Sequence, residues 1–226
     1  TKGKVITYGV NNDSADVNLS DVQEKYSGNP VTTFTANFPD SKKIISTINA
    51  LGTTHTSAIA AALAVADALK VDSDSILKGL ETYKPAPGRL NVIGGIKHAT
   101  IIDDTYNASP DSMREALTLL ERMPAPVKMA VLGDMLELGE ISDEAHKQIG
   151  IAVATLNLDH FVTVGPSGKL MADAARVAGM PADKILSFDS SPQAQATVQQ
   201  ILKPDSLVLI KGSQSKKKKK ITKEIM

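Results

Sequence analysis

A short segment in the middle of the chain concentrates side chains that can do chemistry. Two carboxylates, Asp103 and Asp104, follow an apolar run that reads as a buried strand. A phenol and an amide come next, at Tyr106 and Asn107, and Pro110 stands where it can open a helix. Ligands of doubly wound α/β sheets bind beyond the carboxyl ends of the strands. The segment therefore predicts a ligand site at the end of a strand.

Composition limits the kinds of protein that this chain can be. Its 226 residues, 42% of them hydrophobic, suffice to bury one or two cores. Lys plus Arg and Asp plus Glu both number 25, so no net charge attracts the chain to nucleic acid or to an anionic membrane. The lack of cysteine in the sequence excludes disulfides and thiolate chemistry. Without a long apolar stretch or a signal-like start, we expect no membrane insertion and a cytoplasmic location.

The first part of the chain reads as a β-rich region followed by helices. Runs of β-branched residues predict strands at 4–10, 31–35 and 43–48. The spacing of apolar residues then predicts helices at 57–69 and 74–83. Two prolines and a glycine within residues 84–88 stop the second helix and stiffen the chain. We therefore place a domain boundary at residue 86.

The second part alternates short apolar runs with helical spacing. A hairpin signal, Gly94–Gly95, separates runs at 91–93 and 96–102. Further strands are predicted at 129–133, 161–165, 185–188 and 207–210, with helices at 111–122, 142–157, 167–178 and 191–202. Each connection is long enough for a crossover helix, which favours a mostly parallel sheet with helices on both faces. We expect an α/β fold of Rossmann-like architecture.

Charged residues follow two more of these strands. Asp134 comes directly after the strand at 129–133, and Lys211 directly after the last strand. The carboxylates could hold ribose hydroxyls, magnesium-bound water or an amine, and Lys211 could pair with a phosphate or carboxylate. Structural roles fit the pattern equally well, with Asp104 as a turn residue, Asp134 as a helix N-cap and Lys211 as a solvated strand end.

The chain lacks the glycine motifs that bind nucleotide phosphates. No strand is followed by Gly-x-Gly-x-x-Gly, and Gly165 and Gly168 are too close together for a Walker A loop. We interpret residues 165–169 as a strand-to-helix turn with Ser167 as N-cap. His146 falls in a predicted helix, where a histidine is usually structural. Because no second His or Cys stands at ligand spacing, we expect no metal centre.

Four blocks of the sequence resemble the Mur ligase family in order and spacing. They are residues 87–90, 103–113, 131–139 and 209–213. The Tyr-Asn-Ala of the second block and the Gly-Asp-Met-x-Glu-Leu-Gly of the third are similar to the MurF type within that family. The resemblance implies an ATP- and Mg²⁺-dependent ligase of peptidoglycan precursor synthesis. Such a ligase joins D-alanyl-D-alanine to UDP-N-acetylmuramoyl-tripeptide through an acyl phosphate.

The resemblance also implies an order of domains. The family has an N-terminal domain for the UDP-sugar, a central ATPase domain with a P-loop, and a Rossmann-like C-terminal domain that admits the amino substrate. Residues 1–86 then correspond to the tail of the central domain, and residues 87–226 to the C-terminal domain. The chain starts at Thr1 rather than Met and contains no Gly-x-x-Gly-Lys-Thr/Ser. We therefore expect a part of a longer protein that is inactive by itself.

Roles for the nucleotide side of the site follow from the resemblance alone. Arg89 matches an arginine that reaches the ATP phosphates, and Asp104 matches an acidic residue that contacts the ribose. Tyr106 and Asn107 are implied to flank the base. His55 takes the place of an adenosine-contacting asparagine at the start of the alanine-rich helix. Two structural alternatives stay open, an exposed linker role for Arg89 and a Tyr106 ring packed over the sheet edge.

Roles for the substrate side also follow from the resemblance. The residues implied to lie there are Asn107, Ser109, Asp134, Lys211 and Ser213. The resemblance implies three catalytic residues, Arg89, Asp104 and Lys211. It places them together at the point where the amine of the dipeptide attacks the activated acid.

The expected partners are the two substrates, UDP-N-acetylmuramoyl-tripeptide and D-alanyl-D-alanine. The run Lys216–Lys220 is compatible with a nucleic-acid patch or with a solvated face. Because no aromatic residues interleave it, we expect no nucleic-acid binding, and we expect a monomer for the full-length protein. Two other functions stay open, a non-catalytic binding module that retains a ligase-derived fold and another Mur-type amino acid ligase.

Overall fold

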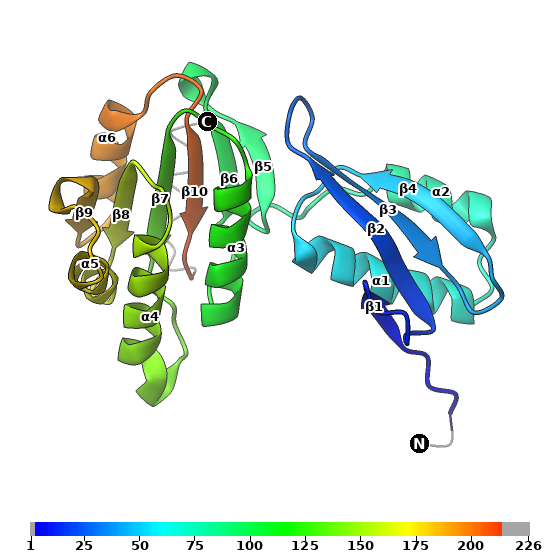
Figure 1. Cartoon of the computed structure of the whole chain (residues 1–226). Coiled ribbons are helices and arrows are strands. Elements are labelled where there is room, and N and C mark those ends of the chain that lie inside the picture. Colours follow the sequence, from blue (N-terminus) through cyan, green and yellow to red (C-terminus); the bar gives the residue numbers. More distant parts are fainter. Residues whose placement is uncertain (1–2, 214–226) are drawn as a thin grey trace. The chain divides into compact units, whose positions relative to one another are not determined.

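The computed structural model describes residues 3–213, and the lysine run at 216–220 lies outside that range. The described residues divide after Pro85 into two compact units, each with its own sheet (Figure 1). Within the described residues, no helix is both long and apolar enough to cross a membrane.

The first unit is a four-stranded sheet with two helices. Its elements are β1 (Tyr8–Val10), β2 (Val17–Lys25), β3 (Val31–Asn37), β4 (Lys43–Ile48), α1 (Thr53–Ala68) and α2 (Ser73–Glu81). Strand β1 is parallel to β2, while β2, β3 and β4 are antiparallel neighbours. Alternate residues of β3 and β4 are buried and pack against both helices, so one face of the sheet carries the core.

Strand β2 is the element of this unit that the sequence did not predict. Val17 and Leu19 are buried, but polar Ser20 and Asp21 interrupt the apolar pattern after them. The pairing of β2 with β3 shifts its register between Ser20 and Gln23, and Asp21 takes a φ of 53°. Such a bulge breaks the strict alternation by which strands are recognised in a sequence.

The second unit is built on a six-stranded sheet with the strand order β5-β6-β10-β7-β8-β9. Its strands and helices are β5 (Asn91–Gly94), β6 (Thr100–Asp104), α3 (Pro110–Arg122), β7 (Lys128–Gly133), α4 (Ser142–Ala154), β8 (His160–Val164), α5 (Gly168–Val177), β9 (Ile185–Phe188), α6 (Ser191–Ile201) and β10 (Leu207–Lys211). Short 3-10 turns lie at η1 (Ile96–His98), η2 (Gly139–Ile141) and η3 (Ala182–Lys184). Strand β5 is antiparallel to β6, and every other neighbouring pair of this sheet is parallel.

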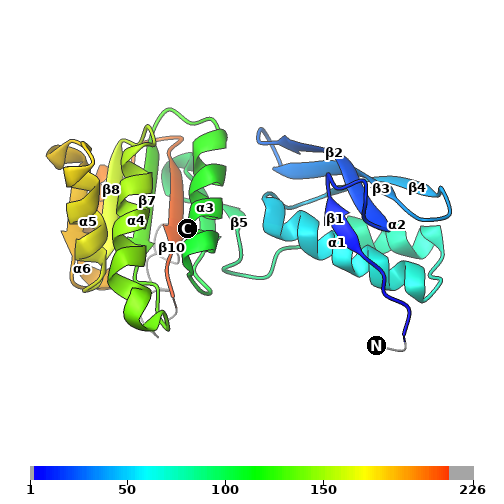
Figure 2. The ribbon, with the colours of Figure 1, turned by 60° about the horizontal axis from the view of Figure 1, so that its bottom comes forward.

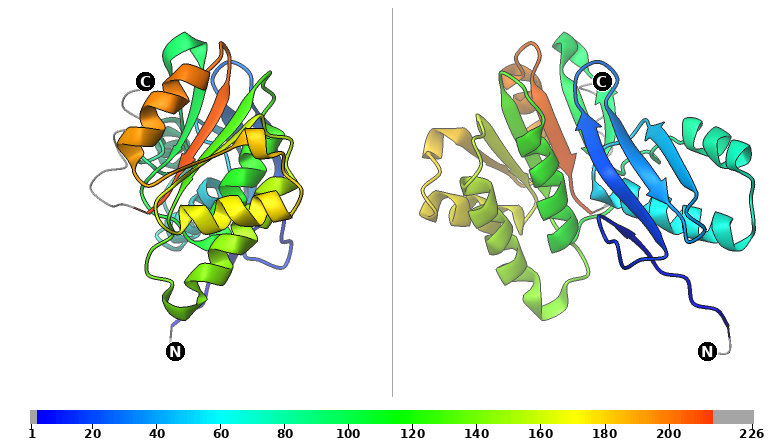
Figure 3. Two further views of the ribbon diagram at one scale, coloured as in Figure 1. Left: turned by 90° about the vertical axis from the view of Figure 1, so that its left-hand side faces the viewer. Right: turned by 45° about the vertical axis from the view of Figure 1, so that its right-hand side comes forward.

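Helices cover both faces of this sheet, as expected. Helices α3, α4 and α5 lie side by side along one face (Figure 2), and α6 covers the other face (Figure 3, left). Under α6, Val131 and Ile210 of the strands pack with Val198 of the helix in a buried apolar cluster. The expected mostly parallel α/β fold is confirmed.

The hairpin predicted around Gly94–Gly95 is present, but its second strand begins later than the predicted residue 96. Strands β5 and β6 do pair antiparallel, but β6 begins only at Thr100. Lys97 and His98 take φ values of 55° and 59° and form part of a 3-10 turn between the strands. This left-handed backbone ends the extended run that an apolar pattern from Ile96 onward predicted.

Candidate active site

The carboxyl ends of β6 and β10 bring an aspartate and a lysine together. Lys211 is aligned with Asp104 across the parallel pair of strands, so the two side chains project from the same face of the sheet. The Lys211 Nζ atom lies 2.5 Å from Asp104 Oδ2 and also donates to the carbonyl of Asn107 at 3.1 Å. Asp104 Oδ1 accepts a hydrogen bond from the Leu90 amide at 3.1 Å. Both carboxylate oxygens therefore have donors from the chain itself.

This ion pair is buried. The side chains of Lys211 and Asp104 expose only 1% and 10% of their surfaces. Burial raises the pKa of Asp104, and the charge and hydrogen bond of Lys211 counteract part of that rise. The alternative of Lys211 as a solvated strand end is therefore wrong, and Asp104 is a paired strand residue rather than a turn residue.

Arg89 and Tyr106 form a stacked pair on the surface beside the ion pair. The Arg89 guanidinium carbon lies 4.0 Å from the centroid of the Tyr106 ring, which is 48% exposed. The Tyr106 amide donates to the carbonyl of Gly88 at 2.9 Å, which ties the two segments together. Gly88 has a φ of 78°, and a Cβ there would lie 3.0 Å from the Tyr106 nitrogen. The turn therefore favours glycine, and it sets Arg89 over the ring.

Ser213, just beyond β10, joins two other loops of the edge. Its hydroxyl donates to the carbonyl of Ala108 at 3.3 Å and accepts from the Leu136 amide at 3.0 Å. Its own amide donates to the carbonyl of Asp134 at 3.0 Å. Because Ser213 is buried and these hydrogen bonds go to backbone groups, it fixes the loops after β6 and β7 relative to each other.

Asp134 uses its carboxylate to cap helix α5. Its Oδ1 atom accepts from the amide of Gly168, the first residue of that helix, at 3.0 Å. Ser167 holds the N-cap position, but its side chain makes no cap hydrogen bond, so the predicted capping role of Ser167 is wrong. Gly165 has a φ of 106°, and a Cβ there would collide with the Asp134 carboxylate. The structure therefore confirms the alternative interpretation of Asp134 as a residue that caps a helix.

His146 of α4, for which we expected a structural role, holds the loop after β7. Its ring is fully buried, and its Nε2 atom accepts from the Met135 amide at 2.9 Å. Its Nδ1 atom lies 2.6 Å from the carbonyl of Ser142, which requires a proton on Nδ1 and leaves Nε2 free to accept. The signal for this role was the helical spacing that places His146 on the buried face with Ile149 and Val153.

Ser109 forms the N-terminal cap of α3. The Ser112 amide donates to the Ser109 hydroxyl at 3.4 Å, and the Ser109 amide donates to the Ser112 hydroxyl at 3.0 Å. Pro110 occupies the first turn of the helix, as the sequence predicted. Asn107 stands at the surface, with its carbonyl bound by Lys211.

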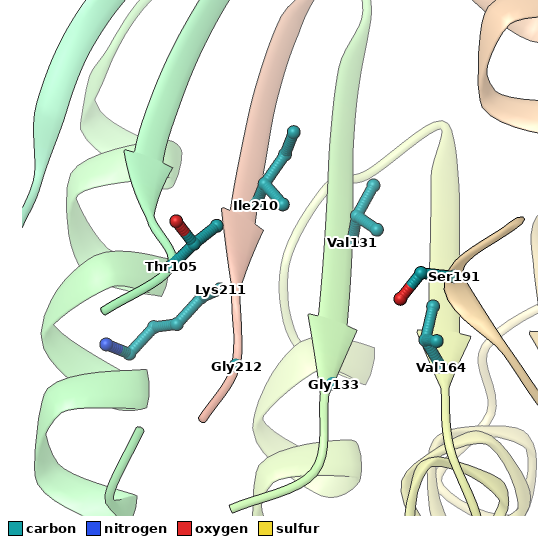
Figure 4. A pocket seen from close by; sticks show the side chains of 8 residues that line it. All are labelled: Thr105, Val131, Gly133, Val164, Ser191, Ile210, Lys211 and Gly212. Carbon is teal, nitrogen blue, oxygen red and sulfur yellow. The ribbon is translucent and has the colours of Figure 1, made fainter. Parts of the chain in front are cut away.

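A small pocket lies between the carboxyl ends of β6, β10, β7 and β8 (Figure 4). It is lined by Thr105, Val131, Gly133, Val164, Ser191, Ile210, Lys211 and Gly212. Its volume of ≈ 10 Å³ suits about one water molecule. In Figure 4 the Lys211 side chain turns toward Thr105 and away from Val164. The pocket is therefore too small for a nucleotide, and exposed groups at the edge are the ones a large ligand can reach.

His55 lies in the first unit, near the start of α1. It is buried, and its Nδ1 atom lies 2.7 Å from the hydroxyl of Tyr83, whose pKa is raised by burial. The two rings meet edge to face, with centroids 5.9 Å apart. His55 thus contacts Tyr83 of its own unit, and its predicted adenosine contact stays a prediction.

The edge offers groups for a nucleotide but no cage for a metal ion. Among residues 3–213, no three His, Cys, Asp or Glu side chains gather as metal ligands. A guanidinium stacked on an exposed aromatic ring fits the phosphates and base of ATP. Mg²⁺ usually binds through substrate phosphates and a few waters, so it would enter with the nucleotide.

Residues 88–214 match the sequence profile described as "Mur ligase, glutamate ligase domain". The chain belongs to the Mur ligase family. It is 31% identical over 167 residues to the UDP-N-acetylmuramoyl-tripeptide–D-alanyl-D-alanine ligase of Bacillus subtilis, covering 74% of this chain and 36% of that protein. The Escherichia coli ligase of the same name is 34% identical over 155 residues, covering 69% of this chain and 33% of the relative. The chain thus spans about a third of the length of these Mur ligases.

Solved MurF structures share the fold of the chain. MurF from Acinetobacter baumannii superposes with a TM-score of 0.82 at 29% identity, covering 96% of this chain and 46% of that one. MurF from Thermotoga maritima, solved in complex with ADP, gives a TM-score of 0.77 at 26% identity and covers 97% and 48%. The expected resemblance to the MurF type of Mur ligase is confirmed.

The structure brings eight of the nine predicted site residues to one edge of the second sheet. They are Arg89, Asp104, Tyr106, Asn107, Ser109, Asp134, Lys211 and Ser213. Asp104, Lys211 and Ser213 are buried and bonded to other parts of the chain, whereas Arg89, Tyr106 and Asn107 are exposed. The ninth residue, His55, lies in the first unit.

Proposed function

We propose that this chain is part of a cytoplasmic, monomeric ATP-dependent ligase. The ligase adds D-alanyl-D-alanine to UDP-N-acetylmuramoyl-tripeptide in peptidoglycan precursor synthesis. Family membership and the names of the relatives support this assignment. Residues 1–86 act as part of the central ATP-binding domain, and the second unit, from residue 87, as the domain that receives the amino substrate. The cytoplasmic location follows from the substrates, because ATP and UDP-linked precursors are intracellular compounds.

ATP with Mg²⁺ supplies the phosphoryl group that activates the tripeptide carboxylate. ADP leaves as the acyl phosphate forms; the amine of D-alanyl-D-alanine then attacks its carbonyl carbon and loses a proton, and phosphate leaves as the amide forms. Negative charge develops on oxygen in both steps. Preorganised donors stabilise such charge best where they need not reorganise during the reaction. Arg89 is the donor that we assign to the phosphates, because its planar guanidinium binds two oxygens at once. The Tyr106 ring beneath it limits the directions in which the guanidinium can point.

The other edge residues take complementary roles. Asn107 and Tyr106 expose an amide and an aromatic ring that suit a nucleotide base and ribose. Asp104 and Lys211 form a buried ion pair, and their hydrogen bonds hold the backbone of Leu90 and Asn107. Through this backbone they position the exposed residues of the edge. Ser109, Asp134 and Ser213 shape the substrate side through the backbone of the surrounding loops.

The match to the Mur ligase family carries this proposal, and the stacking of Arg89 on the exposed Tyr106 ring carries the role that we assign to Arg89. The test uses the whole ligase that contains this chain, with ATP, UDP-N-acetylmuramoyl-tripeptide and D-alanyl-D-alanine. Replacing Arg89 by alanine should lower kcat about 10²-fold or more, since that is the usual effect of removing one donor to a developing charge. The free energy of unfolding of this variant should fall by only about 0.5–1 kcal/mol, the usual contribution of an exposed cation–π contact such as that between Arg89 and Tyr106.

A matched control is Arg176→Ala, which removes an exposed arginine that pairs with Asp173 in its own helix. This variant should keep the wild-type rate of phosphate release. Full activity in Arg89→Ala would remove Arg89 from the mechanism. No dipeptide-dependent phosphate release by the wild-type ligase would refute the proposed function and favour a non-catalytic module. The isolated chain, which contains no Gly-Lys-Thr/Ser phosphate loop, should release no phosphate.

A further inference from the structure

The loop between β7 and α4 presents the large apolar side chain of Leu136 at the edge of the site. Leu136 is 47% exposed, whereas Met135 before it is buried. The amide of Leu136 donates to Ser213 and the amide of Met135 donates to His146. Glu137 after it takes a left-handed φ of 65°. Hydrogen bonds therefore hold the backbone of this loop at two successive residues, Met135 and Leu136.

Hydrogen bonds connect this loop directly to the predicted substrate side. Ser213, which accepts from the Leu136 amide, donates to the carbonyl of Ala108. The residue before Ala108 is Asn107, whose carbonyl is bound by Lys211. Leu136 thus belongs to the same edge as the ion pair and the Arg89–Tyr106 stack. It supplies a large exposed apolar side chain among groups that are otherwise mostly polar.

A rigid position makes an exposed leucine useful for recognition. A side chain on a flexible loop must be ordered before it can contact a ligand, and that ordering weakens binding. The hydrogen bonds to His146 and Ser213 order the backbone in advance. Small-molecule sites combine apolar walls with a few placed polar groups, and the walls decide which apolar substituents fit. The methyl groups of D-alanyl-D-alanine are substituents of that kind.

We infer that Leu136 determines specificity for the amino substrate by contacting its small apolar side chain. Ser213 and His146 are positioning residues that act through the backbone of the loop. The inference rests on the proposed function and adds to it a residue that discriminates between acceptor dipeptides. The class of acceptor selected is a dipeptide with short, uncharged side chains.

The test measures kcat/KM of the whole ligase for D-alanyl-D-alanine and for D-alanyl-D-valine. Leu136→Ala shortens the apolar wall and makes room for the larger side chain. The preference for D-alanyl-D-alanine over D-alanyl-D-valine should fall about tenfold, in line with the discrimination that one or two methyl groups allow. The KM for ATP should stay unchanged. The matched control is Ile141→Ala, which truncates another exposed residue of the same connection, 62% exposed, and should leave the preference unchanged.

Two further variants test the positioning role. Ser213→Ala removes the acceptor for the Leu136 amide and should raise the KM for the dipeptide while leaving the KM for ATP unchanged. Ser213→Thr keeps the hydroxyl and should restore the dipeptide KM, which a merely structural role of the small side chain would not explain. If the wild type turns over both dipeptides and Leu136→Ala keeps the wild-type preference, the inference is overturned while the proposed function stands. A wild-type ligase without dipeptide-dependent turnover overturns both.

Discussion

Replacing Lys211 by methionine should reduce stability by an amount that grows with pH. Methionine keeps an unbranched apolar side chain but removes the ammonium that donates to Asp104 and to the Asn107 carbonyl. The variant retains a buried carboxylate, to which the Leu90 amide is the remaining donor among residues 3–213. Removing one partner of a buried ion pair typically costs about 3–5 kcal/mol.

The loss of stability in Lys211→Met has an upper limit, because Asp104 can take up a proton and so avoid an unpaired buried charge. Burial already raises the pKa of Asp104 above its ordinary value of 3.8, and Lys211 lowers it, so losing Lys211 moves that pKa higher. A carboxyl group that is protonated in the folded variant and ionised in the unfolded chain costs about 1.4 kcal/mol for each pH unit above its unfolded pKa. The limit is therefore about 4 kcal/mol at pH 7 and about 2 kcal/mol at pH 5.

The sign of the pH dependence follows from proton binding. Because the pKa of Asp104 is raised in the folded state, the folded variant binds more protons than the unfolded chain does. Its stability is greatest below the unfolded pKa of Asp104 and falls as pH rises toward the folded pKa. Acid should thus partly rescue Lys211→Met relative to the wild type.

The assay is urea unfolding of the chain between pH 5 and pH 8, followed by far-UV circular dichroism because the sequence contains no tryptophan. The free energy of unfolding of the second unit is compared between wild type and Lys211→Met. Lys169→Met, which removes an exposed lysine of α5, should change it by less than about 0.5 kcal/mol. Asp104→Asn combined with Lys211→Met removes both charges and should be more stable at pH 7 than Lys211→Met alone. A loss below about 1 kcal/mol at pH 7, or an equal loss at pH 5 and pH 8, would refute a buried charge pair.

Two other substitutions test how the second unit is held together. Ser109→Ala should lower the free energy of unfolding by about 1 kcal/mol because it removes the cap of α3, whereas Ser109→Asp should keep most of it; equal losses in denaturant titrations would contradict the capping role. Gly150→Ala should cost about 1–3 kcal/mol, because a Cβ on this residue of α4 would meet the carbonyl oxygen of Met171 in α5. Gly79→Ala, in open space on α2, should be neutral or stabilise by up to about 1 kcal/mol, and a Gly150→Ala midpoint as high as this control's would refute close helix packing.

The alternation of strands and helices in the second unit could be predicted because each buried strand is a short apolar run. Residues 129–133 and 185–188, for example, carry that pattern, and the structure has strands there. Strand β2 could not be predicted, because its exposed face is polar and its bulge interrupts the period. The start of β6 was missed for a related reason, since the left-handed residues Lys97 and His98 leave no mark in a hydrophobic pattern.

The place of the candidate site could be predicted, but its internal contacts could not. Polar residues after apolar runs indicate the carboxyl edge of a parallel sheet whatever the order of its strands. The pairing of Asp104 with Lys211 depends on that order, because β10 lies between β6 and β7 although it comes last in the chain. The contact between Asp134 and the start of α5 likewise depends on how neighbouring strands are placed. The packing of the whole sheet determines the strand order, and a local stretch of sequence does not contain that information.

Burial separates the residues of this edge into two groups with different expected phenotypes. Asp104, Lys211 and Ser213 are buried, and their hydrogen bonds to the chain hold the loops that carry the exposed residues. Substituting them should therefore alter stability and activity together, since the geometry above them relaxes. Arg89 and Leu136 are exposed on these loops, so substituting them should alter rate or specificity with a loss of stability of about 1 kcal/mol or less. A ligase that must orient its substrates needs both groups of residues. An exposed side chain can orient a substrate precisely only if the backbone that carries it is itself held in place.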